Sequence, residues 1–224
     1  VEKIEALGAK FIEIPMNKNG LSPLADITYC LKLRSIMKAE KADAILGYTI
    51  KPVIYGSIAG WLAGVKKRIA MVTGAGYLFA NKSLKVRIIR SISFVLYRIG
   101  LWAAQKVIFQ NVDDLNEFVE YGLVEKDKCY VVNGSGVNMS RFTPSAYPDV
   151  PTFFFLGRLV YAKGGMDFVK AAKIVKEKYP KSRFMILGKI DKTVPDAISS
   201  EDLMPYVNDG TVELFPETDN IEQY

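Results

Sequence analysis

Residues 152–165 of the chain read TFFFLGRLVYAKGG, and this stretch decides the fold. Its first five residues form a short apolar run, which is typical of a buried strand, and residues 165–178 repeat apolar side chains at a helical spacing. A strand, a short loop and a helix in this order place the loop at the carboxyl edge of a parallel sheet, where open α/β proteins bind their ligands. The sequence therefore predicts a ligand-binding loop at residues 157–164.

The residues of this loop suit an anionic ligand. Free N–H groups at a helix N-terminus attract anions, and Gly164 and Gly165 allow a phosphate to approach the backbone closely. Arg158 offers a planar fork of donors, and Lys163 offers a point charge. Together they can hold a diphosphate without a metal ion. The alternative is a solvated loop with two ordinary basic residues.

Short apolar runs alternate with amphipathic stretches along the rest of the chain. This pattern predicts parallel sheets joined by helical crossovers. We expect strands at residues 10–14, 43–48, 68–73, 106–110, 129–133, 152–156, 183–187 and 211–215. We expect helices at residues 1–7, 26–40, 52–63, 83–104, 113–121, 165–178 and 199–207, and the start of another at 220–224. The expected fold class is α/β, with two Rossmann-like domains.

A proline-rich stretch separates the two expected domains. Residues 142–151 contain three prolines and show no periodicity, which indicates an interdomain linker. We expect residues 1–149 to form the first domain and residues 150–224 the first part of the second. Both are expected to be incomplete, because the first opens on a helix instead of a strand and the second holds only three strands.

The composition excludes several kinds of catalytic site. The chain has no histidine, which excludes Ser-His-Asp hydrolysis and histidine-ligated zinc. It has two cysteines, far apart in sequence, which fits a reducing compartment. It has no D-x-D motif, no secretory signal and no apolar run of about 18 residues. We therefore expect a cytoplasmic protein with no metal site and no cofactor.

The charges are unevenly distributed along the chain. Residues 1–110 hold 17 Lys and Arg against 6 Asp and Glu, a net charge of +11. Residues 111–224 hold 13 against 18, a net charge of −5. This contrast indicates two units with different partners, and an anionic lipid, a polyphosphate or a nucleic acid would fit the basic half. No RNA- or DNA-binding module is recognisable, so a nucleic acid is not expected.

Several motifs together resemble those of glycosyltransferase family 4, a group of retaining sugar transferases with two Rossmann-like domains (the GT-B fold). The loop 157–164 matches a G-R-L-x-x-x-K-G signature. Residues 47–56, GYTIKPVIYG, resemble a strand-to-helix turn of the family's acceptor domain, and residues 73–79, TGAGYLF, resemble its T-G-x-G-Y loop. Residues 133–144 resemble its N-G-x-x-V-D…F-x-P stretch, with Asn138 in place of Asp. The resemblance spans nearly the whole chain.

This resemblance implies a metal-independent, retaining hexosyltransferase. It would move a sugar from a nucleotide-diphosphate sugar, with a UDP-sugar as the expected donor, to a hydroxyl acceptor. Arg158 and Lys163 are the implied catalytic residues, which grip the diphosphate. The expected donor-binding residues are Gly157, Gly164, Gly165, Gly188 and Phe215. The expected acceptor-binding residues, in the first domain, are Thr73, Gly74, Gly76 and Tyr77.

The subgroup of closest character makes bacterial surface polysaccharides or lipid-linked oligosaccharides. It implies a saccharide acceptor, carried on polyprenyl diphosphate, and a protein held peripherally on the inner face of the membrane. The family's E-x7-E element would lie beyond Tyr224, so the expected activity is that of a longer chain. Two alternatives remain: a nucleotide-sugar epimerase of the same fold, and a non-catalytic subunit that binds a sugar nucleotide or a lipid carrier.

The helix expected at residues 83–104 is the candidate contact with an anionic membrane. On a helical wheel its aliphatic side chains form one stripe, which we expect to face the core: Leu84, Ile88, Ile92, Val95 and Ile99. A second sector interleaves basic and aromatic side chains, which suits a bilayer interface. The residues expected to contact the membrane are Arg87, Arg90, Phe94, Tyr97 and Arg98. The alternative is an ordinary solvated helix face.

Overall fold

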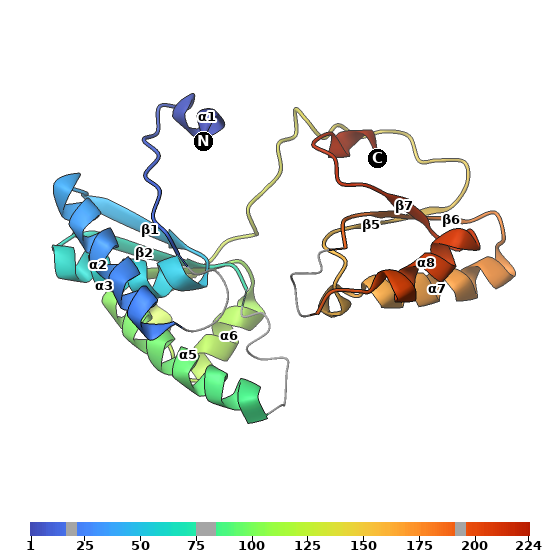
Figure 1. Ribbon diagram of the computed structural model, residues 1–224. Helices are drawn as coiled ribbons and strands as arrows, with labels where there is room; N and C mark the ends of the chain where they lie inside the picture. The colour runs from blue at the N-terminus through green and yellow to red at the C-terminus, as the bar shows by residue number, and fades with distance from the viewer. Residues whose placement is uncertain (17–21, 75–83, 191–195) are drawn as a thin grey trace. The chain divides into compact units, whose positions relative to one another are not determined.

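The computed structural model describes residues 1–16, 22–74, 84–190 and 196–224, and the side chains of all of these except residues 84–88. The chain divides into two compact units, Val1–Gly136 and Val137–Tyr224 (Figure 1). Each unit has its own sheet and its own hydrophobic core. The assignment of residues 1–149 to an acceptor domain and of residues 150–224 to a donor domain remains a prediction.

The first unit is built on a four-stranded parallel sheet. Its strands are β1 (Ala44–Tyr48), β2 (Lys67–Val72), β3 (Lys106–Phe109) and β4 (Cys129–Val131), and they lie in the order β1-β2-β3-β4. Every neighbouring pair is parallel, so the carboxyl ends of all four strands share one edge. The strands can all be parallel because a helical segment connects each strand to the next.

Three helical segments pack side by side in the first unit. They are α2 (Pro23–Ala39), the π-helical turn η1 (Pro52–Gly56) that continues into α3 (Ser57–Ala63), and α5 (Leu84–Ala103). Helix α3 contacts both α2 and α5, and Figure 1 shows the three grouped on one side of the sheet. The other helical elements described in this unit are α1 (Glu2–Glu5), α6 (Val112–Glu120) and η2 (Lys126–Lys128).

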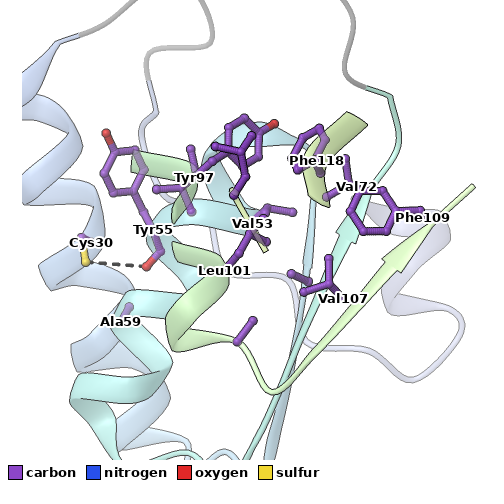
Figure 2. Close-up of a cluster of buried hydrophobic side chains, with 14 of the residues drawn as sticks. Cys30, Val53, Tyr55, Ala59, Val72, Tyr97, Leu101, Val107, Phe109 and Phe118 are labelled. Carbon is purple, nitrogen blue, oxygen red and sulfur yellow. Dashed lines mark hydrogen bonds between the residues drawn. The ribbon is translucent and has the colours of Figure 1, made fainter. Parts of the chain in front are cut away.

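The core of the first unit lies between these helices and the sheet (Figure 2). The Phe118 ring stands edge-on to the rings of Tyr97 and Phe109, at centroid distances of 5.1 and 5.3 Å. Helix α5 crosses η1 closely at Gly100, where an added Cβ would lie 2.7 Å from Ile54 Cα. A larger residue at this position would push the two elements apart.

The second unit is built on a three-stranded parallel sheet in the order β5-β6-β7. The strands are β5 (Thr152–Leu156), β6 (Arg183–Leu187) and β7 (Glu213–Phe215). The helical elements are η3 (Tyr161–Lys163), α7 (Gly165–Lys178), α8 (Ser200–Asn208) and η4 (Ile221–Gln223). Apolar side chains from each layer close the core: Leu159, Val169, Ile186, Ile198, Leu203 and Val212.

Most of the expected elements are confirmed, with ends that differ by three residues or fewer. The α/β class with two parallel sheets is confirmed as well. The strand expected at residues 10–14 is wrong, because this segment pairs with no described strand. Its apolar residue Ile14 packs on the core without a ladder. Residues 142–151 contain no helix or strand, as expected of a linker.

The contrast of charge is smaller between the two structural units than between the two halves of the sequence. The first unit holds 19 Lys and Arg against 12 Asp and Glu, a net charge of +7, and the second holds 11 against 12, a net charge of −1. The difference arises because α6 and the turn after it, which carry six acidic residues, belong to the first unit.

Candidate functional site

A pocket of about 490 Å³ lies at the carboxyl edge of the second unit's sheet. Because β5, β6 and β7 are parallel, the segments that follow them meet at this edge. Two of the expected donor-binding residues, Gly157 and Gly188, line the pocket together with Arg158. The sequence therefore placed these three residues correctly at one edge.

The loop 157–164 is held in shape by bonds to residues 196–202. Backbone N–H groups of Tyr161 and Ala162 donate to the backbone carbonyl and the side-chain carboxylate of Asp196, at 3.0 and 2.8 Å. The Tyr161 hydroxyl donates to Asp202, at 2.7 Å, and hydrogen bonds from Ser199 and Tyr161 hold the pKa of Asp202 below its usual range. Among the described residues, the bonds that fix the loop thus involve the backbone of Arg158 and Lys163 but not their side chains.

Two glycines of this loop region are required by geometry. Gly164 has a φ of +76°, a left-handed conformation that favours glycine, and it precedes the first turn of α7. Gly188 lies so close to the neighbouring loop that an added Cβ would be 2.2 Å from the backbone oxygen of Gly157. The third, Gly165, is buried, and a Cβ there would meet the Ile198 side chain at 2.6 Å.

Both expected catalytic side chains are exposed. Within the described part of the chain, neither Arg158 nor Lys163 takes part in an ion pair. Arg158 lines the 490 Å³ pocket, whereas Lys163 ends η3 at the other side of the loop and is not among the lining residues. The structure thus brings Arg158 to the pocket and places Lys163 at the start of helix α7.

Sequence reasoning missed the segment that closes the pocket after β7. Glu217, Thr218, Asp219 and Ile221 line it, and the Glu217 carboxylate lies 3.4 Å from the Lys189 ammonium group. Arg141 fastens this segment from the linker: its guanidinium donates two hydrogen bonds to Glu222, at 3.0 and 2.8 Å, and one to the Asp219 carbonyl. The signal available in the sequence was this arginine, three residues before the first proline of the linker.

A second pocket, of about 420 Å³, lies beside the first and shares Gly188 and Glu217 with it. The expected donor-binding residue Phe215 lines it, next to Pro216. The Phe215 ring also packs on Tyr224, with a centroid distance of 5.0 Å. The charged residues Arg158, Glu217 and Asp219 line the first pocket. Most of the residues that line the second pocket are apolar or glycine.

Two of the four expected acceptor residues fall at the carboxyl edge of the first unit's sheet. Thr73 and Gly74 follow β2 directly. Gly76 and Tyr77 lie outside the described residues. Directly after the neighbouring strand β1, Thr49 has a φ of +72°, which is a strained conformation for a β-branched residue and is typical of functional sites.

A largely buried ion pair stands at this same edge, and sequence reasoning did not identify it. Lys51 Nζ lies 2.6 Å from an oxygen of Asp26, and the two side chains are only 12% and 3% exposed. The Tyr55 hydroxyl donates to the other Asp26 oxygen, at 3.2 Å. Burial, together with the Asp26 charge and this hydrogen bond, raises the pKa of Tyr55 to about 12. The lysine directly before Pro52 was the signal in the sequence.

The assignment of faces on α5 is wrong. Ile92, Val95 and Ile99, expected to face the core, are exposed. Tyr97, expected at a membrane, is only 2% exposed, because it packs against Phe118.

The other residues of the expected membrane sector are partly engaged within the unit. Phe94 is half-buried against Tyr121, at a centroid distance of 5.0 Å. Arg98 donates to the carbonyls of Gly122 and Tyr121, at 2.8 and 3.2 Å. Arg90 is half-buried, and the side chain of Arg87 lies outside the described residues.

None of the helices among the described residues combines the length and the apolar character that a membrane span requires. No group of acidic, cysteine or histidine side chains in the same residues is arranged to hold a metal ion.

The chain is similar to known proteins in sequence and in fold. The profile of the family described as glycosyl transferase 4-like matches residues 1–111. The chain is 24% identical, over 225 residues, to the N,N'-diacetylbacillosaminyl-diphospho-undecaprenol alpha-1,3-N-acetylgalactosaminyltransferase of Campylobacter jejuni. The aligned region covers 94% of this chain and 57% of the relative.

Solved structures with the same fold include a protein in complex with UDP and a putative epimerase. The Anabaena protein HepE in complex with UDP has a TM-score of 0.66 at 15% identity, over 91% of this chain and 56% of that protein. A putative UDP-N-acetylglucosamine 2-epimerase from Listeria monocytogenes has a TM-score of 0.61 at 12% identity, over 99% and 60%. The chain thus spans less than two thirds of the length of each of these proteins.

Proposed function

We propose that this chain, whose residues 1–111 belong to the glycosyl transferase 4-like family, is part of an enzyme that transfers a sugar from a nucleoside-diphosphate sugar to a hydroxyl acceptor. The observation that carries the proposal is Arg158, unpaired in the described chain and lining a pocket at the carboxyl edge of a parallel sheet. The loop that bears it leads into α7 through the left-handed Gly164.

The donor would bind in the second unit. Arg158 and the N-terminus of α7 would hold the diphosphate, with Lys163 completing the charge, and the pocket lined by Phe215 would take the base. Positive charge aimed at the leaving diphosphate stabilises the transition state, where negative charge develops on that group. Since these residues supply the charge, we propose a metal-independent reaction. UDP is the proposed nucleotide, because it is present in the HepE complex.

The acceptor would bind at the carboxyl edge of the first unit, near Thr73 and Gly74. The name of the Campylobacter relative specifies a sugar on diphospho-undecaprenol, which supports a lipid-linked saccharide as the acceptor here. An enzyme with such a substrate works at a membrane surface. We therefore propose a peripheral protein on the cytoplasmic face, and a hexosyl transfer that retains the configuration of the donor sugar.

An epimerase is the second candidate, because a protein named as an epimerase shares the fold. The family match over residues 1–111 and the Campylobacter relative favour transfer. The two reactions differ in what they consume: epimerisation needs only the sugar nucleotide, whereas transfer releases free UDP in an amount equal to the glycosylated acceptor. Incubation of the sugar nucleotide with and without acceptor separates them.

The test of the donor site compares three substitutions in the second unit. Arg158→Ala and Lys163→Ala each remove one charge-assisted contact, worth about 1.5–3 kcal/mol. We expect UDP, titrated calorimetrically into the chain, to bind about tenfold to hundredfold more weakly in each case, and transfer by the longer enzyme to fall by a similar factor. Lys170→Ala, which removes an exposed lysine from the body of α7, is the matched control. Equal UDP affinity in all four proteins would refute the assignment.

A further inference from the structure

Residues 217–221, named here the β7 wall, line the 490 Å³ pocket and receive little support from their own part of the chain. Residues 216–220 form no helix or strand, and η4 is a single turn of three residues. A local hydrogen bond runs from the Asn220 N–H to the Thr218 hydroxyl, at 3.1 Å. A short loop of this kind opens easily unless contacts from elsewhere fix it.

Two of the contacts that reach this segment from other elements lie at its ends. The ion pair between Lys189 and Glu217 spans 3.4 Å, and both side chains are more than 60% exposed, so solvent screens it. The Tyr224 ring packs on Phe215 beyond the residues that line the pocket. The middle of the wall must therefore be fixed by another partner.

Arg141 is that partner, although it lies about 80 residues earlier in the chain. It binds both carboxylate oxygens of Glu222 and the carbonyl of Asp219, and these three hydrogen bonds are named here the Arg141 clasp. Bidentate pairing is the geometry in which an arginine holds a carboxylate most firmly. The same hydrogen bonds hold the pKa of Glu222 below its usual range, so the carboxylate is ionised at neutral pH. Figure 1 shows the linker, in yellow, passing beside η4.

The clasp can act on a ligand only through the wall. Asp219 and Ile221 line the pocket, whereas Arg141 and Glu222 do not. The wall bears the carboxylates of Glu217 and Asp219, which repel a diphosphate. A diphosphate held by the arginine of the same pocket therefore leaves the wall to contact an uncharged part of the ligand. The neighbouring pocket, proposed above for the base, shares Glu217 with the wall, so this part is the nucleoside.

We propose that Arg141 is a positioning residue of the candidate donor site, which holds the β7 wall in the arrangement that contacts the nucleoside. This inference rests on the proposed function, since it requires a nucleotide in the pocket. When a site is formed in only a fraction of the molecules, the apparent dissociation constant rises by the inverse of that fraction. Loss of the clasp should therefore weaken nucleotide binding while every residue that touches the nucleotide is retained.

The first experiment titrates UDP calorimetrically into the unmodified chain and two clasp variants. We expect the dissociation constant to rise about threefold to tenfold in Arg141→Ala and about threefold in Glu222→Ala. The two substitutions change the charge in opposite directions, and loss of a negative charge should by itself strengthen the binding of an anion. Weaker binding by Glu222→Ala thus supports the clasp, whereas equal or tighter binding overturns the proposal.

The matched controls break a second arginine–glutamate pair of the same unit. Arg183 donates to both oxygens of Glu213, at 2.9 and 2.6 Å, and the exposure of this pair is similar to that of the clasp. Both residues begin strands, so they lie at the edge of the sheet opposite the pocket. We expect Arg183→Ala and Glu213→Ala to bind UDP within about 1.5-fold of the unmodified chain. Losses as large as those of the clasp variants would show a general effect of charge or stability and refute the positioning role.

Inorganic pyrophosphate, which lacks a nucleoside, is the second probe. We expect Glu222→Ala to bind it at least as tightly as the unmodified chain does. If this variant loses as much affinity for pyrophosphate as for UDP, the wall does not contact the nucleoside and the proposal is wrong.

Hydrogen–deuterium exchange without ligand tests the clasp itself. We expect the amides of residues 216–224 to exchange at least about threefold faster in both clasp variants, with no change in the controls or in the peptides of α7. Equal exchange in all five proteins would show that the clasp does not fix the wall. UDP that binds equally to all five proteins overturns this inference alone. UDP bound by none of them refutes the proposed function and, with it, the nucleoside as the ligand of the wall.

Discussion

Substitution of Gly188 by alanine should break the candidate donor site by a backbone collision. The new Cβ would lie 2.2 Å from the Gly157 oxygen, where carbon and oxygen normally stay about 3.3 Å or more apart. The two loops must therefore separate by about 1 Å. The obstacle is backbone and no rotamer relieves it, so we expect the upper part of the usual overpacking range, about 3 kcal/mol. For a unit of this size, such a loss lowers Tm by more than about 10 °C.

Gly157→Ala is the control for Gly188→Ala at the adjoining strand end. The nearest atom to a Cβ at Gly157 is Phe155 Cε1 at 3.8 Å, an ordinary contact. We expect Gly157→Ala to change stability by less than about 1 kcal/mol. Urea unfolding followed by two probes separates the units: tryptophan emission reports the first unit, which holds both tryptophans, and far-ultraviolet circular dichroism reports both.

The expected pattern for Gly188→Ala is a lower midpoint by circular dichroism with an unchanged midpoint by tryptophan emission. If Gly188→Ala unfolds at the same urea concentration as the unmodified chain, the close approach of the two loops is wrong. If both alanine variants lose stability equally, the effect comes from glycine as such and the steric argument fails.

Three more predictions concern the ion pair, alkaline pH and metal dependence. Asp26→Asn should destabilise the first unit by about 3 kcal/mol, because it leaves the Lys51 charge largely buried without a partner; a urea midpoint equal to that of the unmodified chain would contradict this. Tyr55 has a folded pKa of about 12 against about 10 when unfolded, so the unfolded chain releases this proton first and stability should fall as pH rises from about 10 to about 12. Tyr55→Phe should make that fall shallower in unfolding measured at pH 9 and pH 11. Sugar transfer by the longer enzyme should survive EDTA, and activity that is lost in EDTA and restored by magnesium would refute metal independence.

The positions of most strands and helices could be predicted because their signals are local. Four consecutive apolar residues followed by glycine predict a strand end, as at Leu156 and Leu187, and both strands end there. Residues 10–14 also hold three apolar side chains, yet a strand exists only where a neighbouring strand supplies the hydrogen-bond ladder, and none of the described strands does so here. Whether such a segment forms a strand therefore depends on a partner strand elsewhere in the chain and not on the local pattern of side chains.

The face of α5 could not be chosen from hydrophobicity, because the helix has apolar side chains on two sides. The buried side is identified by its small residues: Ser93 and Gly100 are buried, and Gly100 stands against the backbone of Ile54. The sequence-based prediction placed the opposite side in the core because that side carries large aliphatic residues. Close helix packing selects small residues, and this would have been the better guide.

The candidate donor site was predictable where its residues follow consecutive strands and unpredictable where they depend on a turn. That Arg158 and Gly188 line one pocket could be predicted because the carboxyl ends of parallel strands share one edge. That Asp219 lines it could not, because the position of its segment depends on hydrogen bonds from Arg141, far earlier in the chain. The Asp26–Lys51 pair escaped notice for the same reason, since its members are 25 residues apart.

The fixed loop 157–164 also bears on how this protein can change over evolution. Its shape depends on the backbone, Tyr161, Asp196 and Asp202, and among the described residues its two cationic side chains contribute no hydrogen bond to that shape. Substitutions at positions 158 and 163 can therefore change the charge that the loop presents while the bonds that hold the loop stay in place. The charge of the loop can thus vary over evolution through single substitutions that leave its supporting hydrogen bonds intact.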